Sequence, residues 1–253
     1  MELTLQMNGP ARALLVHIES YSHTGNRESN QDRLGAAHRG PLWCGVVADG
    51  AGGHQAGEVA ASLAVQTVLD AWTQAPLWNA PALRGLLELA NQQILLAQSA
   101  QQSCQDMHST ACVLLINTAT GAALHAHVGD SRIYHFRGHG LLGRTLDHSV
   151  RQWLIDQGQS PEGQARNALY TALGEPCSHF VVSSTPQPVE VLPGDWFLMC
   201  SDGLWEFFSD EELALLGQQL RASPAFFTHL HQLVMERAKG QADNFTGLAV
   251  FVD

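Results

Sequence analysis

The sequence predicts an α+β layered fold with antiparallel sheets. Strand-like and helix-like patterns are grouped along the chain rather than alternating, as a doubly wound parallel sheet would require. The two longest helix patterns each have a single apolar face, which a flat surface such as a sheet would cover. No linker-like segment interrupts the 253 residues, so we expect one domain over residues 1–253.

The first part of the chain runs from strands into helices. We expect a strand over Ala13–Tyr21, and the letters HTGNRESNQD that follow are typical of a loop. The apolar run Leu42–Ala48 predicts a buried strand that ends in a turn at Asp-Gly-Ala-Gly-Gly. Apolar residues at helical spacing predict helices over Ala56–Trp72 and Ala80–Ala100.

The second part returns to strands. The expected strands are Thr110–Asn117, Ala122–Phe136 with a break at Gly129-Asp130, Phe180–Ser184, Trp196–Cys200 and Phe245–Val252. We also expect a short helix over Asp147–Gln157, an exposed connection over Gly158–Arg166 and a helix over Pro224–Lys239.

Charge and cysteine content exclude several classes of protein. Lys and Arg number 13 and Asp and Glu 24, so the formal net charge is −11. Nucleic acid and anionic membranes need a basic face and are not expected as partners. The five cysteines include no CxxC pair, which argues against a disulfide framework or a thiolate zinc site. With no apolar run of membrane-spanning length and no leader pattern, we expect a cytoplasmic protein.

Aspartates at strand ends are the most informative feature. Asp49 and Asp202 each follow an apolar run and precede glycine, and Asp130 lies in a looser version of this pattern. A strand end fixes a carboxylate, and the adjacent glycine allows close approach of backbone or ligand. Asp32 in the early loop and Asp243 before the last strand complete a set of five.

Carboxylates that converge repel one another unless a cation lies between them. An all-oxygen donor set favours Mg²⁺ or Mn²⁺ over zinc or copper. Two such ions about 4 Å apart would activate a water and hold a phosphoryl group for in-line attack. A single Asp-Gly pair is above all a turn signal, so the hypothesis depends on the whole set.

Eight segments, in order, resemble the metal-dependent protein phosphatase family, type 2C, in its compact bacterial form. They are Gly25–Arg33 (GNRESNQDR), Val46–Ala61, His108–Ile116, His127–Tyr134, Thr145–Ser149, Asn167–Gly174, Pro193–Glu206 and Asp243–Val252. They cover nearly the whole chain, and the ordered set is specific although each segment is weak. The resemblance implies a four-layer sandwich of two antiparallel β-sheets flanked by α-helices.

The resemblance also implies roles for single residues. Asp49 matches the aspartate that bridges two metal ions, and Gly50 the glycine whose carbonyl binds the second ion. Asp202 and Asp243 match ligands of the first ion, and Asp130 a ligand of a weaker third ion. Asp32 matches an acidic position that holds metal-bound water. Arg27 matches the arginine that grips the substrate phosphate, for which a guanidinium fork is suited.

The chain departs from the family pattern at four places. Ala51 stands where animal members often have a histidine proposed as general acid, and Gln31 replaces a common acidic residue. Thr171 stands where many bacterial members have arginine. The segment Ser149–Leu169, which matches a mobile flap in the family, is short.

Histidines and serines give weaker signals. His125 and His127 share a strand face, but a zinc site there needs further ligands, so we expect partly buried strand residues. We expect His148 to be structural, and His54 follows the metal loop. Ser109 and Ser201 lack the context of a serine hydrolase.

The sequence therefore predicts a phosphoserine and phosphothreonine protein phosphatase that uses two Mn²⁺ or Mg²⁺ ions and opposes a serine/threonine kinase. We expect a monomer, and the pattern is similar to phosphatases that accompany type VI secretion kinases. The alternative is a catalytically weak regulator of the same fold that binds phosphoproteins or a kinase. A cyclase or nuclease that uses two metal ions is a weaker alternative, because the sequence shows no nucleotide-binding or DNA-binding features.

Overall fold

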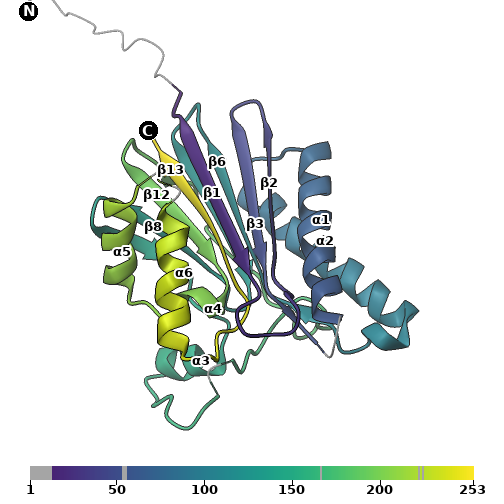
Figure 1. Cartoon of the computed structure of the whole chain (residues 1–253). Helices are drawn as coiled ribbons and strands as arrows, with labels where there is room; N and C mark the ends of the chain where they lie inside the picture. The colour runs from purple at the N-terminus through teal and green to yellow at the C-terminus, as the bar shows by residue number, and fades with distance from the viewer. Residues whose placement is uncertain (1–12, 53–55, 166, 222, 224) are drawn as a thin grey trace, which may run out of the picture.

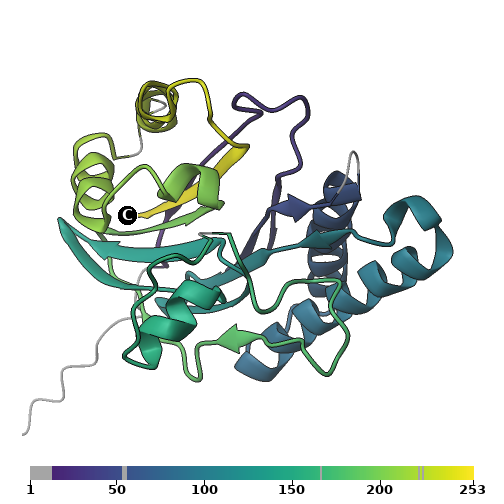
Figure 2. The same ribbon diagram turned by 90° about the horizontal axis from the view of Figure 1, so that it is seen from below.

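Two antiparallel β-sheets pack face to face, and helices cover the outer face of each (Figures 1 and 2). This computed structural model describes residues 13–52, 56–165, 167–221, 223 and 225–253. The layers are helices, sheet, sheet and helices, as the resemblance implies. No helix in these described residues is long and apolar enough to cross a membrane.

The sheet named here the β13 sheet has the strand order β1-β13-β12-β8-β9. Its strands are β1 (Val16–His23), β13 (Phe245–Val252), β12 (Asp195–Cys200), β8 (Arg132–Arg137) and β9 (Gly140–Arg144). The first and last strands of the chain therefore pair, with Val16 opposite Val252.

The second sheet, the β6 sheet, has the order β10-β7-β6-β3-β2, and β11 (Val189–Glu190) also pairs with β7. Its strands are β10 (Ser183–Ser184), β7 (Ala122–Val128), β6 (Ala111–Asn117), β3 (Leu42–Ala48) and β2 (Arg33–Arg39). A short ribbon of β4 (Gly50–Ala51) and β5 (His108–Ser109) lies beyond the end of β3. All of these strand pairs are antiparallel, which excludes the doubly wound alternative.

Helices α1 (Ala56–Gln74) and α2 (Ala80–Ala100) cover the β6 sheet, and α5 (Asp210–Gln219) and α6 (Ala225–Ala238) cover the β13 sheet (Figure 1). Three shorter helices lie in the connections: α3 (Val150–Asp156), α4 (Asp202–Trp205) and the 3-10 helix η1 (Gln102–Cys104). Local chemistry starts these helices, since the side chains of Asn79, Ser149 and Ser209 each accept an amide hydrogen bond from the first turn of α2, α3 and α5.

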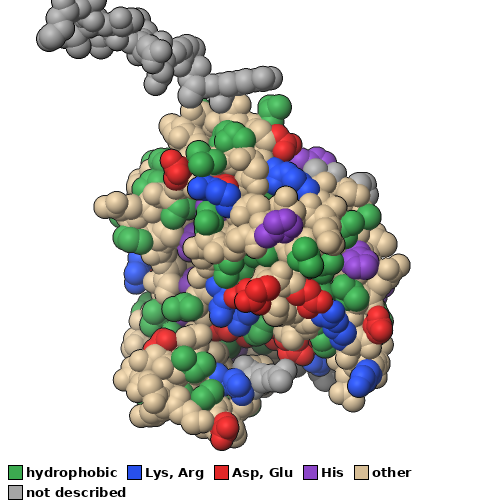
Figure 3. All heavy atoms as spheres, turned by 90° about the vertical axis from the view of Figure 1, so that its left-hand side faces the viewer, with side chains coloured by type: hydrophobic (Ala, Val, Ile, Leu, Met, Phe, Trp, Pro, Cys, Tyr) green, Lys and Arg blue, Asp and Glu red, His purple; other side chains and the backbone are tan. Residues whose placement is uncertain are grey.

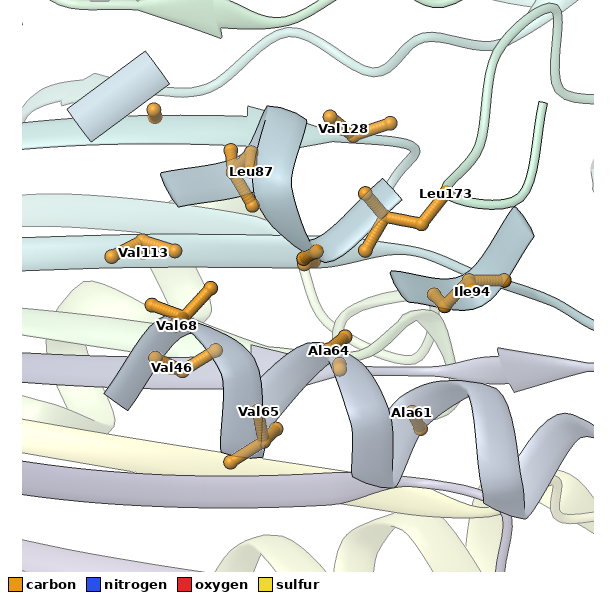
Figure 4. Close-up of a cluster of buried hydrophobic side chains, with 14 of the residues drawn as sticks. Val46, Ala61, Ala64, Val65, Val68, Leu87, Ile94, Val113, Val128 and Leu173 are labelled. Atoms are coloured by element: carbon orange, nitrogen blue, oxygen red, sulfur yellow. The ribbon is translucent and has the colours of Figure 1, made fainter. Parts of the chain in front are cut away.

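Three apolar clusters hold the layers together. One lies between α1, α2 and the β6 sheet, where Val46 and Val113 of the strands meet Val65 and Val68 of α1 (Figure 4). A second fills the space between α5, α6 and the β13 sheet, and the third lies between the two sheets. Burial of this apolar surface is the main term that stabilises such a fold.

The predicted elements are mostly confirmed, with shifted ends. The expected strand over Ala122–Phe136 is two strands, β7 and β8, separated by the turn at Gly129-Asp130. The prediction of a strand over Phe180–Ser184 was wrong for its first half, because only Ser183–Ser184 pairs with β7 and Phe180 packs against the α1–α2 core instead. Residues 158–165 form an exposed connection, as expected.

Three described elements of five or more residues were not predicted. The strand β2 carries small and charged residues at the edge of its sheet, so its apolar pattern is weak. The strand β9 is short and largely exposed. Helix α5 has a low apolar content, and Gly217 inside it is explained only by tertiary packing, because a side chain there would meet the ring of Trp196.

Candidate active site

Acidic residues gather at one end of the sandwich. Strands β3 and β7 are both antiparallel to β6, so their carboxyl ends lie at the same edge and bring Asp49 and Asp130 together. In the other sheet, β12 ends where β13 begins, which brings Asp202 beside Asp243. These four aspartates, with Arg27 and Gly50, line one pocket of about 560 Å³.

Asp49 is fixed through its backbone. Its amide donates to Thr110 Oγ1 at 3.1 Å, and its carbonyl accepts from the Thr110 amide at 2.8 Å and from Ser109 Oγ at 2.9 Å. The next residue must be glycine, because a Cβ at Gly50 would lie 2.0 Å from the carbonyl oxygen of Gly57. The start of α1 therefore packs directly on the acidic turn.

Asp32 is buried behind the pocket rather than lining it, and only 1% of its surface is exposed. Ser201 Oγ donates to Asp32 Oδ2 at 2.7 Å and accepts the Thr246 amide at 3.0 Å. Asp32 Oδ1 is buried without a hydrogen-bond partner. Ser201 is itself buried, and it thus holds the Asp32 carboxylate in place.

The loop that carries Arg27 is tied to the strand that follows Asp243. Asn244 accepts the Gln31 amide at 2.8 Å and donates to the carbonyls of Thr24 and Ser29 at 2.8 and 2.9 Å. These bonds place the exposed Arg27 side chain at the pocket, where Nη2 donates to Asp243 Oδ2 at 2.6 Å. The Asn after the predicted ligand Asp243 was the signal that the sequence analysis missed.

Asp130 is held from the opposite side by an aromatic residue. Trp205 Nε1 donates to the Asp130 carbonyl at 3.0 Å. The Arg132 guanidinium lies 3.4 Å over the Trp205 ring and makes two bonds of 2.7 Å to Asp147. The segments that contain Trp205 and Asp147 were noted in the sequence, but their role in the site was not predicted.

Burial first, and neighbouring carboxylates second, raise the pKa values of the acidic cluster. Burial, followed by the charges of Asp32, Asp202 and Asp130, raises the pKa of Asp49 well above its ordinary value. Burial and the neighbouring Asp202 raise the pKa of Asp130 to about 8. Burial is also the first cause that raises the pKa of Asp32 and of Asp202 to about 6. The cluster is therefore a site where a divalent cation would remove repulsion.

The donor set fits such a cation. It offers carboxylate and carbonyl oxygens, and the unpartnered Asp32 Oδ1 lacks only a donor or a cation-bound water. Within the described part of the chain, no group of three or more His, Cys, Asp or Glu side chains is arranged to hold a metal ion as these side chains lie. Asp243 is instead paired with Arg27. The assignment of Asp49, Gly50, Asp202, Asp243 and Asp130 as ligands stays a prediction.

The positions that depart from the family pattern have different surroundings. Ala51 and Gln31 line the pocket. Thr171 does not line it, because it is buried and its Oγ1 accepts the Val181 amide at 3.0 Å. Asn167 and Leu169 bring the predicted flap segment to the pocket wall. His54 lies outside the described residues.

The histidines of β7 share one face of the strand, as expected, and this face points toward the other sheet. His127 is buried, and its Nε2 lies 2.8 Å from the Leu146 carbonyl, while His125 is partly buried. Burial and the neighbouring His127 lower the pKa of His125 to about 4. Neither forms a zinc site with other described His, Cys, Asp or Glu residues.

The fold and the acidic pocket define a metal-dependent phosphatase, and comparison with known proteins agrees. Residues 20–244 match the family described as Protein phosphatase 2C. The chain belongs to this family and is a metal-dependent protein phosphatase.

Similar proteins include several bacterial phosphatases. It is 30% identical over 220 residues to the serine/threonine phosphatase stp of Listeria monocytogenes, covering 81% of this chain and 82% of the relative. The structure of PppA, a key regulatory component of T6SS in Pseudomonas aeruginosa, matches with a TM-score of 0.76 and 32% identity, covering 95% and 99% of the two chains. The catalytic domain of the phosphatase PstP, solved with two manganese ions, matches with a TM-score of 0.79 and 28% identity, covering 94% and 99%.

Proposed function

We propose that this chain, as one domain over residues 1–253, removes phosphate from phosphoserine and phosphothreonine in proteins. The observation that carries the proposal is the convergence of Asp49, Asp130 and Asp202 on one pocket, where burial is the first cause that raises the pKa of each. Such a cluster is suited to divalent cations and unsuited to a serine or cysteine nucleophile. The name of the Listeria relative supports this substrate class.

Asp49, Gly50, Asp202 and Asp243 would hold two Mn²⁺ or Mg²⁺ ions, and Asp130 would help to hold a third. When bound, these ions would neutralise the phosphate charge and activate a water for attack on phosphorus. The PstP structure with two manganese ions supports the number and kind of ions.

The chain's own residues would orient the reactants. Arg27 stands at the pocket and is mostly exposed, so its guanidinium is free to turn from Asp243 to a phosphate and bind two of its oxygens. Ser201 holds Asp32 in one orientation behind the pocket, where Asp32 would accept a hydrogen bond from water in the site. Bonds from Thr110 and Ser109 keep the Asp49 backbone still.

A cognate serine/threonine kinase would supply the substrates. The similarity to PppA supports a role beside a type VI secretion kinase. We propose a monomer that acts in the cytoplasm. On the face drawn in Figure 3, acidic and basic side chains lie next to one another rather than in a continuous basic surface, which suits a protein partner better than nucleic acid.

Hydrolysis of para-nitrophenyl phosphate and of matched phosphoserine, phosphothreonine and phosphotyrosine peptides tests the proposal. Assays would contain Mn²⁺, Mg²⁺ or chelator, with the variants Asp49→Asn and Asp202→Asn, and with Asp70→Asn on the exposed surface of α1 as control. We expect turnover that needs the metal, prefers the serine and threonine peptides and is lost in the two site variants only. A folded protein that binds Mn²⁺ but turns over none of these would instead be a docking regulator.

A further inference from the structure

His148 lies between two parts of the molecule that meet at the active site. On one side is the turn at Gly129 that presents Asp130, and on the other is the segment Ser149–Leu169 that reaches the pocket wall. The side chain of His148 is 2% exposed and stacks on His127, with ring centroids 4.5 Å apart. It is therefore fixed in position.

Both backbone polar groups of Gly129 form hydrogen bonds with His148. The Gly129 amide donates to His148 Nδ1 at 3.2 Å, and the His148 amide donates to the Gly129 carbonyl at 2.9 Å. Gly129 has a φ of +91°, a conformation that few other residues adopt. Both backbone groups of this buried turn are satisfied by His148, so the geometry of the turn depends on this residue.

The same turn touches the residue that fixes Asp49. A Cβ at Gly129 would lie 2.6 Å from the Thr110 side chain, so the two residues are packed without a gap. Thr110 accepts the Asp49 amide and donates its own amide to the Asp49 carbonyl. A shift of Gly129 would therefore move both Asp130 and the support of Asp49.

The backbone of His148 also anchors the segment beside the pocket. Its carbonyl accepts the Tyr170 amide at 3.0 Å, and next to it Ser149 pairs with Leu169 as an isolated bridge. The Val150 amide donates to the Ala168 carbonyl at 2.8 Å. The two stems of the segment are thus joined to each other and to Gly129 at this residue.

The hydrogen bonds define the tautomer of the ring. Because Nδ1 accepts an amide, the ring proton lies on Nε2, which donates to Ser183 Oγ at 2.8 Å. The buried side chain is satisfied on both nitrogens. Exchange of this ring for another side chain would leave either the Gly129 amide or the Ser183 hydroxyl without its partner.

We propose that His148 is a positioning residue for metal binding, which acts by accepting the Gly129 amide and so fixes Asp130 and the stems of Ser149–Leu169. The link to metal binding rests on the function proposed above. The link to Gly129 rests on geometry alone. Hydrogen exchange of the Gly129 amide tests this link, and Mn²⁺ binding tests the link to the metal.

Two variants separate the two ring contacts. In His148→Asn the amide oxygen takes the place of Nδ1 and still accepts the Gly129 amide, whereas in His148→Gln the amide group takes the place of Nε2 and reaches Ser183 instead. Ser183→Ala is the matched control that removes the second contact only. Hydrogen exchange of the Gly129 and Tyr170 amides and direct Mn²⁺ binding by electron paramagnetic resonance are measured without substrate.

We expect His148→Asn and Ser183→Ala to stay within about threefold of the wild type in both measurements. We expect His148→Gln to exchange the Gly129 amide at least about tenfold faster and to need about tenfold more Mn²⁺, because a buried amide loses its acceptor. Equal behaviour of the Asn and Gln variants, or a Gln variant like the wild type, would overturn the proposal. Failure of turnover in the wild type with this difference intact would refute the proposed function alone.

The wild-type protein gives an independent answer if both His148 variants unfold. Nitrogen-15 spectra of the imidazole rings distinguish the two tautomers. The proposal requires a His148 ring that carries its proton on Nε2. A proton on Nδ1 would overturn it, because the Gly129 amide would then have no acceptor.

Discussion

Replacement of Asp202 by Asn should stabilise the metal-free protein while it abolishes turnover. Burial, with Asp243 as the next cause, raises the pKa of Asp202 from 3.8 to about 6, so the folded state holds this proton more tightly than the unfolded chain does. Stability is then greatest at low pH and falls as the pH rises from about 4 to 6. Above pH 6 the loss is complete, and about 2 pKa units correspond to about 3 kcal/mol.

Asn keeps the shape of the carboxylate without the charge. In a chelator we expect Asp202→Asn to have a free energy of unfolding about 1–3 kcal/mol above that of the wild type at pH 7.5, and about half of that difference at pH 5. Saturating Mn²⁺ should reverse the order, because only the wild type retains the full set of ligands. At 100 times the dissociation constant, the ion adds about 2.7 kcal/mol to the wild type.

Urea unfolding in chelator at the two pH values, followed by far-ultraviolet circular dichroism, measures this. Asp70→Asn, at an exposed position of α1, should show no such dependence on pH. The reasoning is refuted if Asp202→Asn is less stable than the wild type at pH 7.5 in chelator. A difference that stays constant between pH 5 and 7.5 would also refute it.

Three further changes test other parts of the structure. Arg27→Lys should lower kcat/KM for para-nitrophenyl phosphate by about 10–100-fold, since lysine lacks the guanidinium fork. The free energy of unfolding should stay within about 0.5 kcal/mol of the wild type, because the Arg27 side chain is mostly exposed. Unchanged kinetics would contradict the proposed role of Arg27 in phosphate binding. Asp195→Asn should lower the free energy of unfolding by about 2–4 kcal/mol at pH 7, as measured by urea unfolding. Burial raises the pKa of Asp195, but hydrogen bonds from Arg137, the Leu192 amide and His135 outweigh burial and hold the pKa below 3.8. That stabilisation is present above about pH 4 and is lost as the pH falls through the lowered pKa, so curves for the two proteins that fail to converge in acid would count against it. Gly217→Ala should lower the free energy of unfolding by about 1–3 kcal/mol, because the new Cβ would lie 2.1 Å from the Trp196 ring. Gly85→Ala, in the open surface of α2, should instead raise the free energy of unfolding by up to about 1 kcal/mol. Equal effects at both sites would show that packing on Trp196 is not the cause.

Local patterns in the sequence determined much of this protein. The apolar faces of α1 and α2 predicted both helices and the sheet that they cover, since a helix with one apolar stripe must bury it. The strand-end aspartates Asp49, Asp130 and Asp202 were recognisable because the apolar run and the glycine beside each are close in sequence. The order of the eight family-like segments predicted the four-layer sandwich and the roles of single site residues.

Tertiary structure alone decided which of these residues meet. Asp49 and Asp130 share a pocket because β6 lies between their strands, a pairing that no local pattern encodes. No local pattern predicts the roles of Asn244, Trp205 and His148. Their roles come from hydrogen bonds to backbone groups that are distant in the sequence. The raised pKa values have the same origin, since a carboxylate is perturbed by burial and by neighbouring charges, and both exist only once the two sheets are assembled.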